Sequence, residues 1–185
     1  MPGAYSECAV VGFFGEDCER VSFKTFDEVF AAVADGKARY GVVPVENSSS
    51  GSINDVYDLL GKYACHIVGE QLVRVEHCLL GVPGATLETV RTVISHPQAL
   101  AQSSVFVQQH GFKTGTWGNT ADAARHVAEL KDPTVAAIAS AETAGLYGLQ
   151  ILCAGINADG DNTTRFIVIE RAAAAPAMTG DGQRL

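Results

Sequence analysis

The sequence predicts an α/β fold with two α/β lobes built around mainly parallel sheets. Helical periods alternate with short β-prone runs over most of the chain, and short links join them. The length of 185 residues suits about one domain, or two small lobes sharing one chain. An extended stretch over residues 66–80 has no helix in its middle. We expect this stretch to cross from one lobe to the other, with residues 161–170 as the return crossing.

The first element with a clear period is a short amphipathic helix. Apolar side chains recur at helical spacing from Phe26 to Val33. Thr25 and Glu28 form a T-x-x-E capping box in front of them, and Gly36 is a typical stop. The sequence therefore predicts a helix that begins after Thr25 and ends before Gly36.

The elements that follow alternate between the two periods. Residues 41–45 form a compact β-prone run that contains Pro44, and helical spacing returns from Ile53 to Leu60, before Gly61. After the extended stretch, the remaining predicted elements are a brief helix at 86–90, a strand at 92–95, a helix at 97–110, a strand at 112–117, a helix at 121–130, a strand at 135–139, a helix at 141–146, and strands at 150–153 and 164–170.

The charge balance and composition exclude several classes of partner. Lys and Arg total 13 against 21 Asp and Glu, a net charge of -8, whereas duplex binding needs a basic face. The chain has no run of 18 apolar residues and no secretory signal at its start. We therefore expect no nucleic-acid partner and no membrane partner. Five cysteines without a C-x-x-C pair predict reduced thiols, no metal site and a cytoplasmic protein, or a plastid protein in a photosynthetic eukaryote.

Hydroxyl and amide side chains follow the predicted strands. They occur in the loop 46–52, at 95–98, at 119–120 and at Ser140. In parallel α/β sheets such turns lie at the carboxyl ends of strands, where ligands bind and helix N-termini attract anions. Ordinary helix capping is the competing interpretation for each turn. Three serines plus Gly51 exceed what one cap requires, so the loop 46–52 is the stronger functional candidate.

Three ordered motifs point to a known family. They are E-N-S-x-x-G-S at 46–52, S-H-P-Q-A-L-A-Q at 95–102 and N-x-T-R-F at 162–166. Together with shorter matches they span residues 2–166 and resemble the prephenate dehydratase catalytic domain, including the plant-type arogenate dehydratases. The motifs of serine hydrolases, P-loop enzymes and dinucleotide-binding enzymes are absent from the sequence. No cofactor is expected.

The resemblance implies an architecture similar to the type II periplasmic binding proteins, with the active site between the lobes. It implies one catalytic domain over residues 1–171, with lobe one at about 1–75 plus 164–171 and lobe two at about 76–163. We expect a disordered tail at 172–185 and no regulatory ACT domain in this chain. The family usually opens with a hydrophobic strand before the N-terminal turn, and here Met1 lies inside that turn. A homodimer is expected by analogy with the family.

The resemblance also implies an activity, the loss of CO2 and water from prephenate to give phenylpyruvate. Thr164 takes the role of hydrogen-bond donor to the departing ring hydroxyl. Arg165 is the neighbouring cation, but strand alternation points it away from Thr164, so a structural ion pair competes with a binding role. Two alternatives stay open. One is arogenate dehydratase, which gives phenylalanine directly, and the other is a binding module for small carboxylates without catalysis.

The site residues implied by the resemblance fall into two sets. In the first set, hydroxyl, amide and cationic side chains bind the substrate, and the second set supports them. Glu46 orients its loop, because an anion repels an anionic substrate. The predicted substrate-binding residues are Ser6, Asn47, Ser48, Ser95, Thr120, Ser140 and Arg165, and the predicted supporting residues are Glu46, Gly51, His96, Gln98, Asn162 and Phe166.

Overall fold

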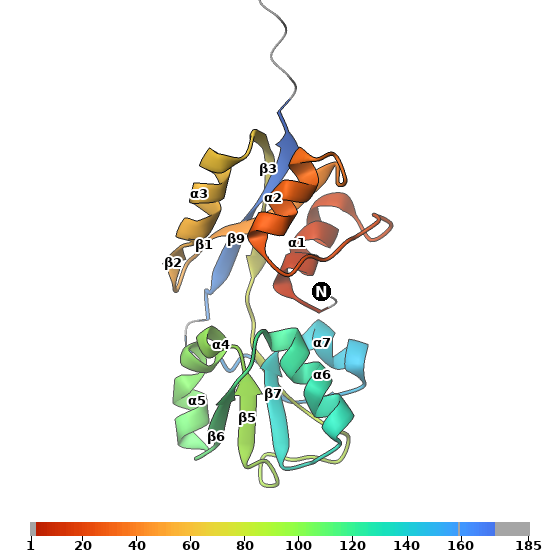
Figure 1. Cartoon of the computed structure of the whole chain (residues 1–185). Coiled ribbons are helices and arrows are strands. Elements are labelled where there is room, and N and C mark those ends of the chain that lie inside the picture. Colours follow the sequence, from red (N-terminus) through yellow and green to blue (C-terminus); the bar gives the residue numbers. More distant parts are fainter. Residues whose placement is uncertain (1–2, 159, 173–185) are drawn as a thin grey trace, which may run out of the picture.

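The computed structural model describes residues 3–158 and 160–172, which form two lobes stacked end to end (Figure 1). Residues 173–185 of the predicted tail at 172–185 lie outside the described residues. Lobe one contains α1 (Tyr5–Phe14), α2 (Phe26–Ala34), β1 (Tyr40–Asn47), β2 (Gly51–Ser52), α3 (Asn54–Lys62), β3 (Cys65–Arg74) and β9 (Thr163–Arg171). Lobe two contains β4 (Cys78–Gly81), β5 (Thr92–Ser95), α4 (Pro97–Gln102), α5 (Ser104–Gln109), β6 (Lys113–Thr116), α6 (Thr120–Leu130), β7 (Val135–Ala139), α7 (Ala141–Tyr147) and β8 (Gln150–Cys153).

Each lobe has its own sheet, and the α/β class is as predicted. The strand order is β2-β1-β9-β3 in lobe one and β6-β5-β7-β4-β8 in lobe two. The description of the sheets as mainly parallel needs correction, because β5 pairs in parallel with β6 and β7 whereas the other described pairs are antiparallel. In lobe one the antiparallel pairing results from the return crossing, which leads into β9. β9 runs between β1 and β3, which are parallel to each other, so both of its pairings are antiparallel.

Helix α2 covers one face of the sheet in lobe one, and its start is as the sequence predicts. Thr25 Oγ1 accepts a hydrogen bond from the Glu28 N–H at 3.2 Å, and Glu28 Oε2 accepts one from the Thr25 N–H at 3.2 Å. A Cβ at Gly41 would lie 2.8 Å from Val29 Cγ1 and 3.0 Å from Ile169 Cγ1. The absence of a side chain at Gly41 therefore lets the helix approach the strands closely, and the core of this lobe lies between them.

Several local elements differ from the sequence prediction. The predicted helix at 97–110 is divided at Ser103 into α4 and α5. The predicted brief helix at 86–90 is a turn, because Thr89 Oγ1 bonds to both the N–H and the carbonyl of Thr86. Helix α1 was not predicted, since its apolar residues do not repeat at helical spacing and Gly12 lies within it. Helix α3 continues through Gly61 to Lys62.

The two crossings between the lobes are bonded to each other. The Val75 N–H donates to the Asn162 carbonyl at 2.7 Å. The side chain of Asn157 joins the same two segments, because its Nδ2 donates to the Val75 carbonyl at 2.7 Å and its Oδ1 accepts from the His77 N–H at 2.6 Å. The outgoing and returning segments therefore form one connected hinge.

Three further features are the outer edge of β1, the length of the helices and the state of the cysteines. Within residues 3–158 and 160–172, no strand pairs with the outer edge of β1 over residues 40–45. No helix of the described chain is long and apolar enough to cross a membrane. The cysteines Cys8, Cys18, Cys65, Cys78 and Cys153 are all free.

Candidate active site

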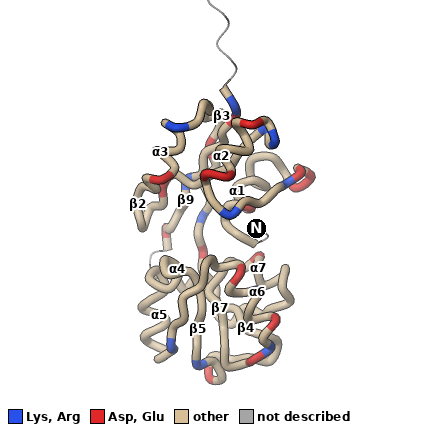
Figure 2. Tube along the Cα trace, in the orientation of Figure 1, with Lys and Arg blue, Asp and Glu red and all other residues tan. Residues whose placement is uncertain are grey.

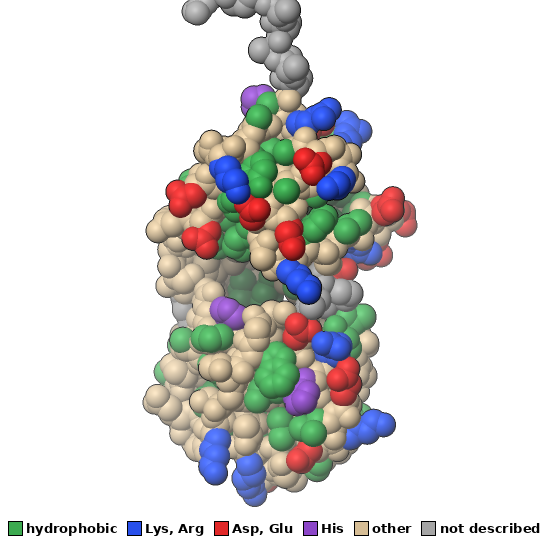
Figure 3. Space-filling model, viewed as in Figure 1, with side chains coloured by type: hydrophobic (Ala, Val, Ile, Leu, Met, Phe, Trp, Pro, Cys, Tyr) green, Lys and Arg blue, Asp and Glu red, His purple; other side chains and the backbone are tan. Residues whose placement is uncertain are grey.

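Several of the predicted site residues lie near the space between the lobes. Figure 3 shows a hollow between the two lobes. Helices α4 and α7, which follow β5 and β7, lie at the edge of lobe two that faces lobe one (Figure 1). Strand β9 begins in lobe one next to the return crossing. Residues from both lobes therefore border the hollow.

A buried cluster of three polar side chains lies at this end of β9. Asn47 Nδ2 donates to Thr164 Oγ1 at 2.8 Å and to Asn162 Oδ1 at 2.7 Å. All three side chains are nearly closed to solvent, with exposures of 5% for Asn47, 0% for Asn162 and 8% for Thr164. Asn162 Nδ2 has no partner among the described residues. A buried donor of this kind costs free energy unless a ligand or a water molecule reaches it.

The loop after β1 fixes the orientation of the Asn47 amide. Asn47 Oδ1 accepts the backbone N–H groups of Ser49 and Ser50 at 3.1 Å each and the Ser50 hydroxyl at 3.2 Å. Backbone N–H groups only donate, so the oxygen and nitrogen of this amide are unambiguous. Gly51 has φ +81°, a conformation that suits glycine, and it closes the turn between β1 and β2. The serine-rich loop thus orients the Asn47 amide of the buried cluster and also reverses the chain between β1 and β2.

Ser48 ties the same loop to the return crossing. Its hydroxyl oxygen accepts the Thr163 N–H at 3.0 Å and donates to the Asp161 carbonyl at 3.3 Å. Its own N–H donates to the Thr163 carbonyl at 2.9 Å. Ser48 therefore belongs to the joint between the loop and β9, next to the cluster but not inside it.

Strand alternation separates Arg165 from Thr164, as the sequence predicts. Thr164 and Phe166 are both buried on one face of β9, whereas Arg165 is half-exposed. The Arg165 guanidinium lies 3.0 Å from the carboxylate of Glu46 and 3.8 Å from that of Glu70. The structure does not bring Arg165 to the cluster. It places Glu46 in the ion pair that competes with a binding role for this arginine.

The predicted serines of lobe two are held by their own lobe. Ser95 is fully buried and donates its hydroxyl proton to the Ile138 carbonyl at 2.6 Å. Ser140 Oγ lies 3.0 Å from Thr143 Oγ1 and 3.5 Å from the Gly3 carbonyl. Both hydroxyls therefore have partners within the protein, and the N-terminal turn at Gly3 rests on α7.

The caps at the helix starts differ from the sequence prediction in part. Asn119 Oδ1 caps α6 by accepting the Asp122 N–H at 2.7 Å, which leaves the predicted Thr120 half-buried as the first helical residue. His96 Nδ1 caps α4 by accepting the Gln98 N–H at 3.2 Å. The starts of α3 and α7 have no side-chain cap, and at α7 the reason is that Ser140 bonds to Thr143 and Gly3 instead.

Positive charge is scarce at the edge of lobe two that faces the hollow. Arg91 and Lys113 lie at the amino ends of β5 and β6, at the opposite end of the lobe (Figure 2). Helix N-termini lie at this edge instead, and α6 and α7 carry the acidic residues Asp122 and Glu142 in their first turns (Figure 2). A carboxylate bound there would be held mainly by N–H groups and hydroxyls.

His77, a buried histidine at the hinge, has a specific partner at each ring nitrogen. His77 is 2% exposed, with Nδ1 3.0 Å from the Tyr5 hydroxyl and Nε2 2.8 Å from Gln102 Oε1. Burial lowers the pKa of His77, although the hydrogen bond to Gln102 raises it. In a neutral ring Nε2–H donates to Gln102 Oε1. The single proton of the Tyr5 hydroxyl is shared between His77 Nδ1 and the Glu76 carbonyl, which lies 2.9 Å from the Tyr5 oxygen. No sequence motif marked His77 or its partner Asn157.

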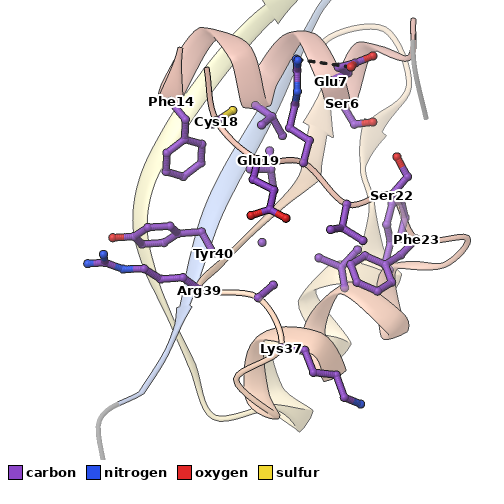
Figure 4. Close-up of a pocket in the computed structure, with 18 of the residues that line it drawn as sticks. Ser6, Glu7, Phe14, Cys18, Glu19, Ser22, Phe23, Lys37, Arg39 and Tyr40 are labelled. Carbon is purple, nitrogen blue, oxygen red and sulfur yellow. Dashed lines mark ion pairs between the residues drawn. The ribbon is translucent and has the colours of Figure 1, made fainter. Parts of the chain in front are cut away.

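A separate pocket of about 500 Å³ lies within lobe one, among α1, residues 18–25 and β1 (Figure 4). Phe14 and Tyr40 line it, and the ion pair of Arg20 with Glu7, at 3.5 Å, lies at its rim. Among its described lining residues Ser6 is the one predicted site residue. The structure thus places Ser6 in this pocket and not in the Asn47 cluster.

The comparisons with known proteins agree with the motifs. The family model described as prephenate dehydratase matches residues 1–174. The chain belongs to the prephenate dehydratase family. Among curated relatives, arogenate dehydratase 1 of Petunia hybrida is 44% identical over 96% of this chain and 42% of its own length. Arogenate dehydratase/prephenate dehydratase 1 of Arabidopsis thaliana, named as chloroplastic, is 43% identical over 92% of this chain and 43% of its own length. The chain thus spans less than half the length of these relatives.

Solved structures show the same fold. The prephenate dehydratase of Arthrobacter aurescens in complex with L-Phe superposes with a TM-score of 0.86 at 28% identity, over 97% of this chain and 60% of that one. A protein described as GqqA, a novel type of quorum-quenching acylase, superposes with a TM-score of 0.83 at 38% identity, over 95% of this chain and 63% of that one. The two-lobed fold is therefore shared by proteins that are described with different activities.

Proposed function

We propose that this chain is the catalytic domain of a dehydratase, a carbon-oxygen lyase that converts prephenate to phenylpyruvate, CO2 and water. The observation that carries the proposal is the buried cluster of Asn47, Asn162 and Thr164 at the border of the inter-lobe hollow. Thr164 Oγ1 accepts from Asn47, so its own proton is left for a ligand. Family membership and the curated relatives support this assignment.

The reaction breaks two bonds of the substrate and makes the ring aromatic. The carboxylate on the ring leaves as CO2, its electron pair enters the ring, and the hydroxyl on the opposite carbon leaves as water after taking up one proton. Aromatisation supplies the driving force, so the protein has to place two carboxylates and provide a hydrogen-bond donor to the departing hydroxyl. Thr164 is the proposed donor. Asn162 Nδ2, a buried donor without a partner among the described residues, is the proposed second donor to a substrate oxygen.

Arogenate is the second candidate substrate, because several curated relatives carry the name arogenate dehydratase. Arogenate carries an ammonium group where prephenate has a keto group, and its product is phenylalanine. A third candidate is a binding module for small carboxylates without turnover. The acylase description belongs to the structural relative, and acylase chemistry gains no support from His77 and His96, whose ring nitrogens contact Tyr5, Gln102 and the Gln98 N–H rather than a serine or threonine.

One set of assays separates these candidates. The parent protein is mixed with prephenate, with arogenate and with an N-acylated amine, and phenylpyruvate, phenylalanine and free amine are measured. We expect kcat/KM to be highest for prephenate. A higher kcat/KM for arogenate would replace the favoured substrate, and release of free amine without either aromatic product would favour an acylase. A thermal shift with prephenate without any product would show a binding module.

Two further properties are proposed on family grounds. We expect the protein to act in the cytoplasm, or in the plastid if its source is a photosynthetic eukaryote, since several relatives are named as chloroplastic. We expect a homodimer, which sedimentation at several protein concentrations would test. A single species with the mass of one chain at all concentrations would reject the dimer.

A further inference from the structure

A continuous chain of hydrogen bonds runs from lobe two to Thr164. Gln98, in the first turn of α4, donates its Nε2–H to Ser50 Oγ at 2.8 Å. Ser50 Oγ lies 3.2 Å from Asn47 Oδ1, and Asn47 Nδ2 lies 2.8 Å from Thr164 Oγ1. The lobes are thus connected by side chains at this point as well as by the crossings of the chain.

Every bond in this series points in the same direction. The Gln98 amide nitrogen only donates, so Ser50 accepts from it and gives its single proton to Asn47 Oδ1. The N–H groups of Ser49 and Ser50 fix that oxygen as an acceptor, so the Asn47 nitrogen donates to Thr164. Among residues 3–158 and 160–172 the proton of Thr164 has no acceptor, so the series ends on a free donor that a ligand can receive.

Hydrogen bonds in series strengthen one another, because each donor polarises the group that it contacts. The inner members, Asn47 and Thr164, are buried, where this effect is strongest. The outer members, Ser50 and Gln98, are exposed and belong to different lobes, so their bond can break when the lobes separate. The weak acidity of a threonine hydroxyl makes the strength of this donor important for a departing hydroxyl.

We propose that Gln98 and Ser50 are positioning residues that couple the contact between the lobes to the donor strength of Thr164. This proposal rests on the proposed function, in which Thr164 donates to the departing hydroxyl. With the lobes in contact, Gln98 directs the Ser50 proton to Asn47 Oδ1. With the lobes apart, the Ser50 hydroxyl is free to turn to water. The site then holds its strongest donor when the substrate is enclosed between the lobes.

The first test removes or reverses the hydrogen bond between Gln98 and Ser50. Gln98→Ala removes the donor, and we expect kcat to fall about fivefold with KM within about twofold of the parent. Gln98→Glu keeps the length of the side chain, but at neutral pH its carboxylate only accepts and draws the Ser50 proton away from Asn47. We expect kcat to fall about twentyfold at pH 7.5. A carboxyl group titrates near pH 4.3, so kcat of Gln98→Glu relative to the parent should rise about threefold by pH 5.

The second test is a double-mutant cycle with a matched control. Ser50→Ala breaks the series one step further in, so adding Gln98→Ala to it should lower kcat by less than about 1.5-fold more. Ser50→Thr keeps the hydroxyl and should restore at least about half of the parental kcat. Gln109→Ala, an exposed glutamine of α5 outside the series, is the control and should leave kcat unchanged.

Three outcomes would overturn the proposal. They are a parental kcat in both Gln98 variants, losses in kcat that multiply in the double variant, and a Gln98→Glu ratio that does not change with pH. If the parent turns over neither prephenate nor arogenate, the proposed function fails by itself. The same cycle is then read on Tm, where additive shifts of the Gln98 and Ser50 variants would overturn the connection between the lobes.

Discussion

The two lobes present the same types of polar side chain to the hollow but use them differently. In lobe one, Asn47 and Thr164 bond to each other and leave a hydroxyl proton free. In lobe two, Ser95 donates to the carbonyl of Ile138, and Ser140 bonds to Thr143. In the proposed reaction lobe one therefore offers a hydroxyl proton to the substrate, whereas the two serine hydroxyls of lobe two are bonded within the protein.

The hydrogen-bond partners explain this difference, because both hydroxyls are buried. Ser95 is fully enclosed between β5 and its neighbours, and a buried hydroxyl must find a partner within the protein. Thr164 is buried as well, but its hydroxyl oxygen accepts from the Asn47 amide and its proton is not used in that bond. Two hydroxyls of similar exposure thus differ in what they can offer to a ligand, and variants of both test the comparison.

The largest effect is expected for Thr164→Ala. Loss of the donor to a departing hydroxyl should lower kcat by about 10²- to 10⁴-fold, and Thr164→Ser should keep kcat within about tenfold. Phenylpyruvate absorbance measures the rate. The control is Thr163→Ala, the half-exposed neighbour whose side chain bonds to the Asp161 carbonyl, which should stay within about threefold. A Thr164→Ala rate within about threefold of the parent, an effect of ~0.6 kcal/mol, would show that the assigned role is wrong.

Asn47→Ala should have the next largest effect. It removes the donor to Asn162 Oδ1 and Thr164 Oγ1 and leaves both buried oxygens without that bond. We expect the free energy of unfolding to fall by about 2 kcal/mol and kcat by at least tenfold. Urea unfolding measures the first quantity and the phenylpyruvate assay the second. An unchanged kcat in a destabilised protein would reduce Asn47 to a structural residue.

Ser95→Ala is the matching change in lobe two. It removes the bond to the Ile138 carbonyl, so the free energy of unfolding should fall by about 1 kcal/mol while kcat/KM stays within about threefold. Urea unfolding and initial rates measure the two quantities. The reverse pattern, a kcat/KM reduced thirtyfold at unchanged stability, would mean that Ser95 contacts the substrate and that the contrast between the lobes does not hold.

His77 at the hinge should make the free energy of unfolding depend on pH. The folded protein holds the pKa of His77 below its ordinary value near 6.5, mainly because the ring is buried. As the pH falls below about 6.5, the unfolded chain takes up a proton at this residue that the folded protein does not, so the free energy of unfolding falls. Tm of the parent should therefore decrease from pH 7.5 to pH 5.5 more than Tm of His77→Gln. Parallel curves for the two proteins would contradict this account.

The smallest effect is expected for Arg165→Ala. The guanidinium and the Glu46 carboxylate are 40% and 48% exposed, and ion pairs at that exposure contribute less than about 1 kcal/mol. We expect kcat/KM within about threefold of the parent in this variant and in Glu46→Gln. A tenfold rise in KM for Arg165→Ala alone would restore this residue to the substrate-binding set.

Much of this fold was predictable because local patterns decide it. The strands at 92–95, 135–139 and 150–153 have the predicted bounds, and the capping box before α2 is present. Helix α1 was missed because its burial against the sheet, rather than its spacing, defines it. The antiparallel arrangement in lobe one was missed because it depends on β9, which comes more than 100 residues later in the chain.

The site was predictable in parts. Motifs located the loop 46–52 and Thr164, and alternation along β9 predicted that Arg165 points away. The contact between Ser50 and Gln98 joins two motifs that lie 48 residues apart and in different lobes. No local period carries that information, because the packing of one lobe against the other determines it. The same reason applies to Asn157 and His77 at the hinge.

The position of β9 has a consequence for how the protein is made. Lobe two consists of one uninterrupted stretch from β4 to β8, so all of its strands are present once that stretch has been synthesised. The sheet of lobe one is incomplete without β9, which pairs Tyr40 with Glu170 and brings Thr164 to Asn47. We expect the nascent chain to carry a folded lobe two before lobe one is complete. The donor of the proposed reaction would then be assembled last, which keeps an incomplete chain from acting on its substrate.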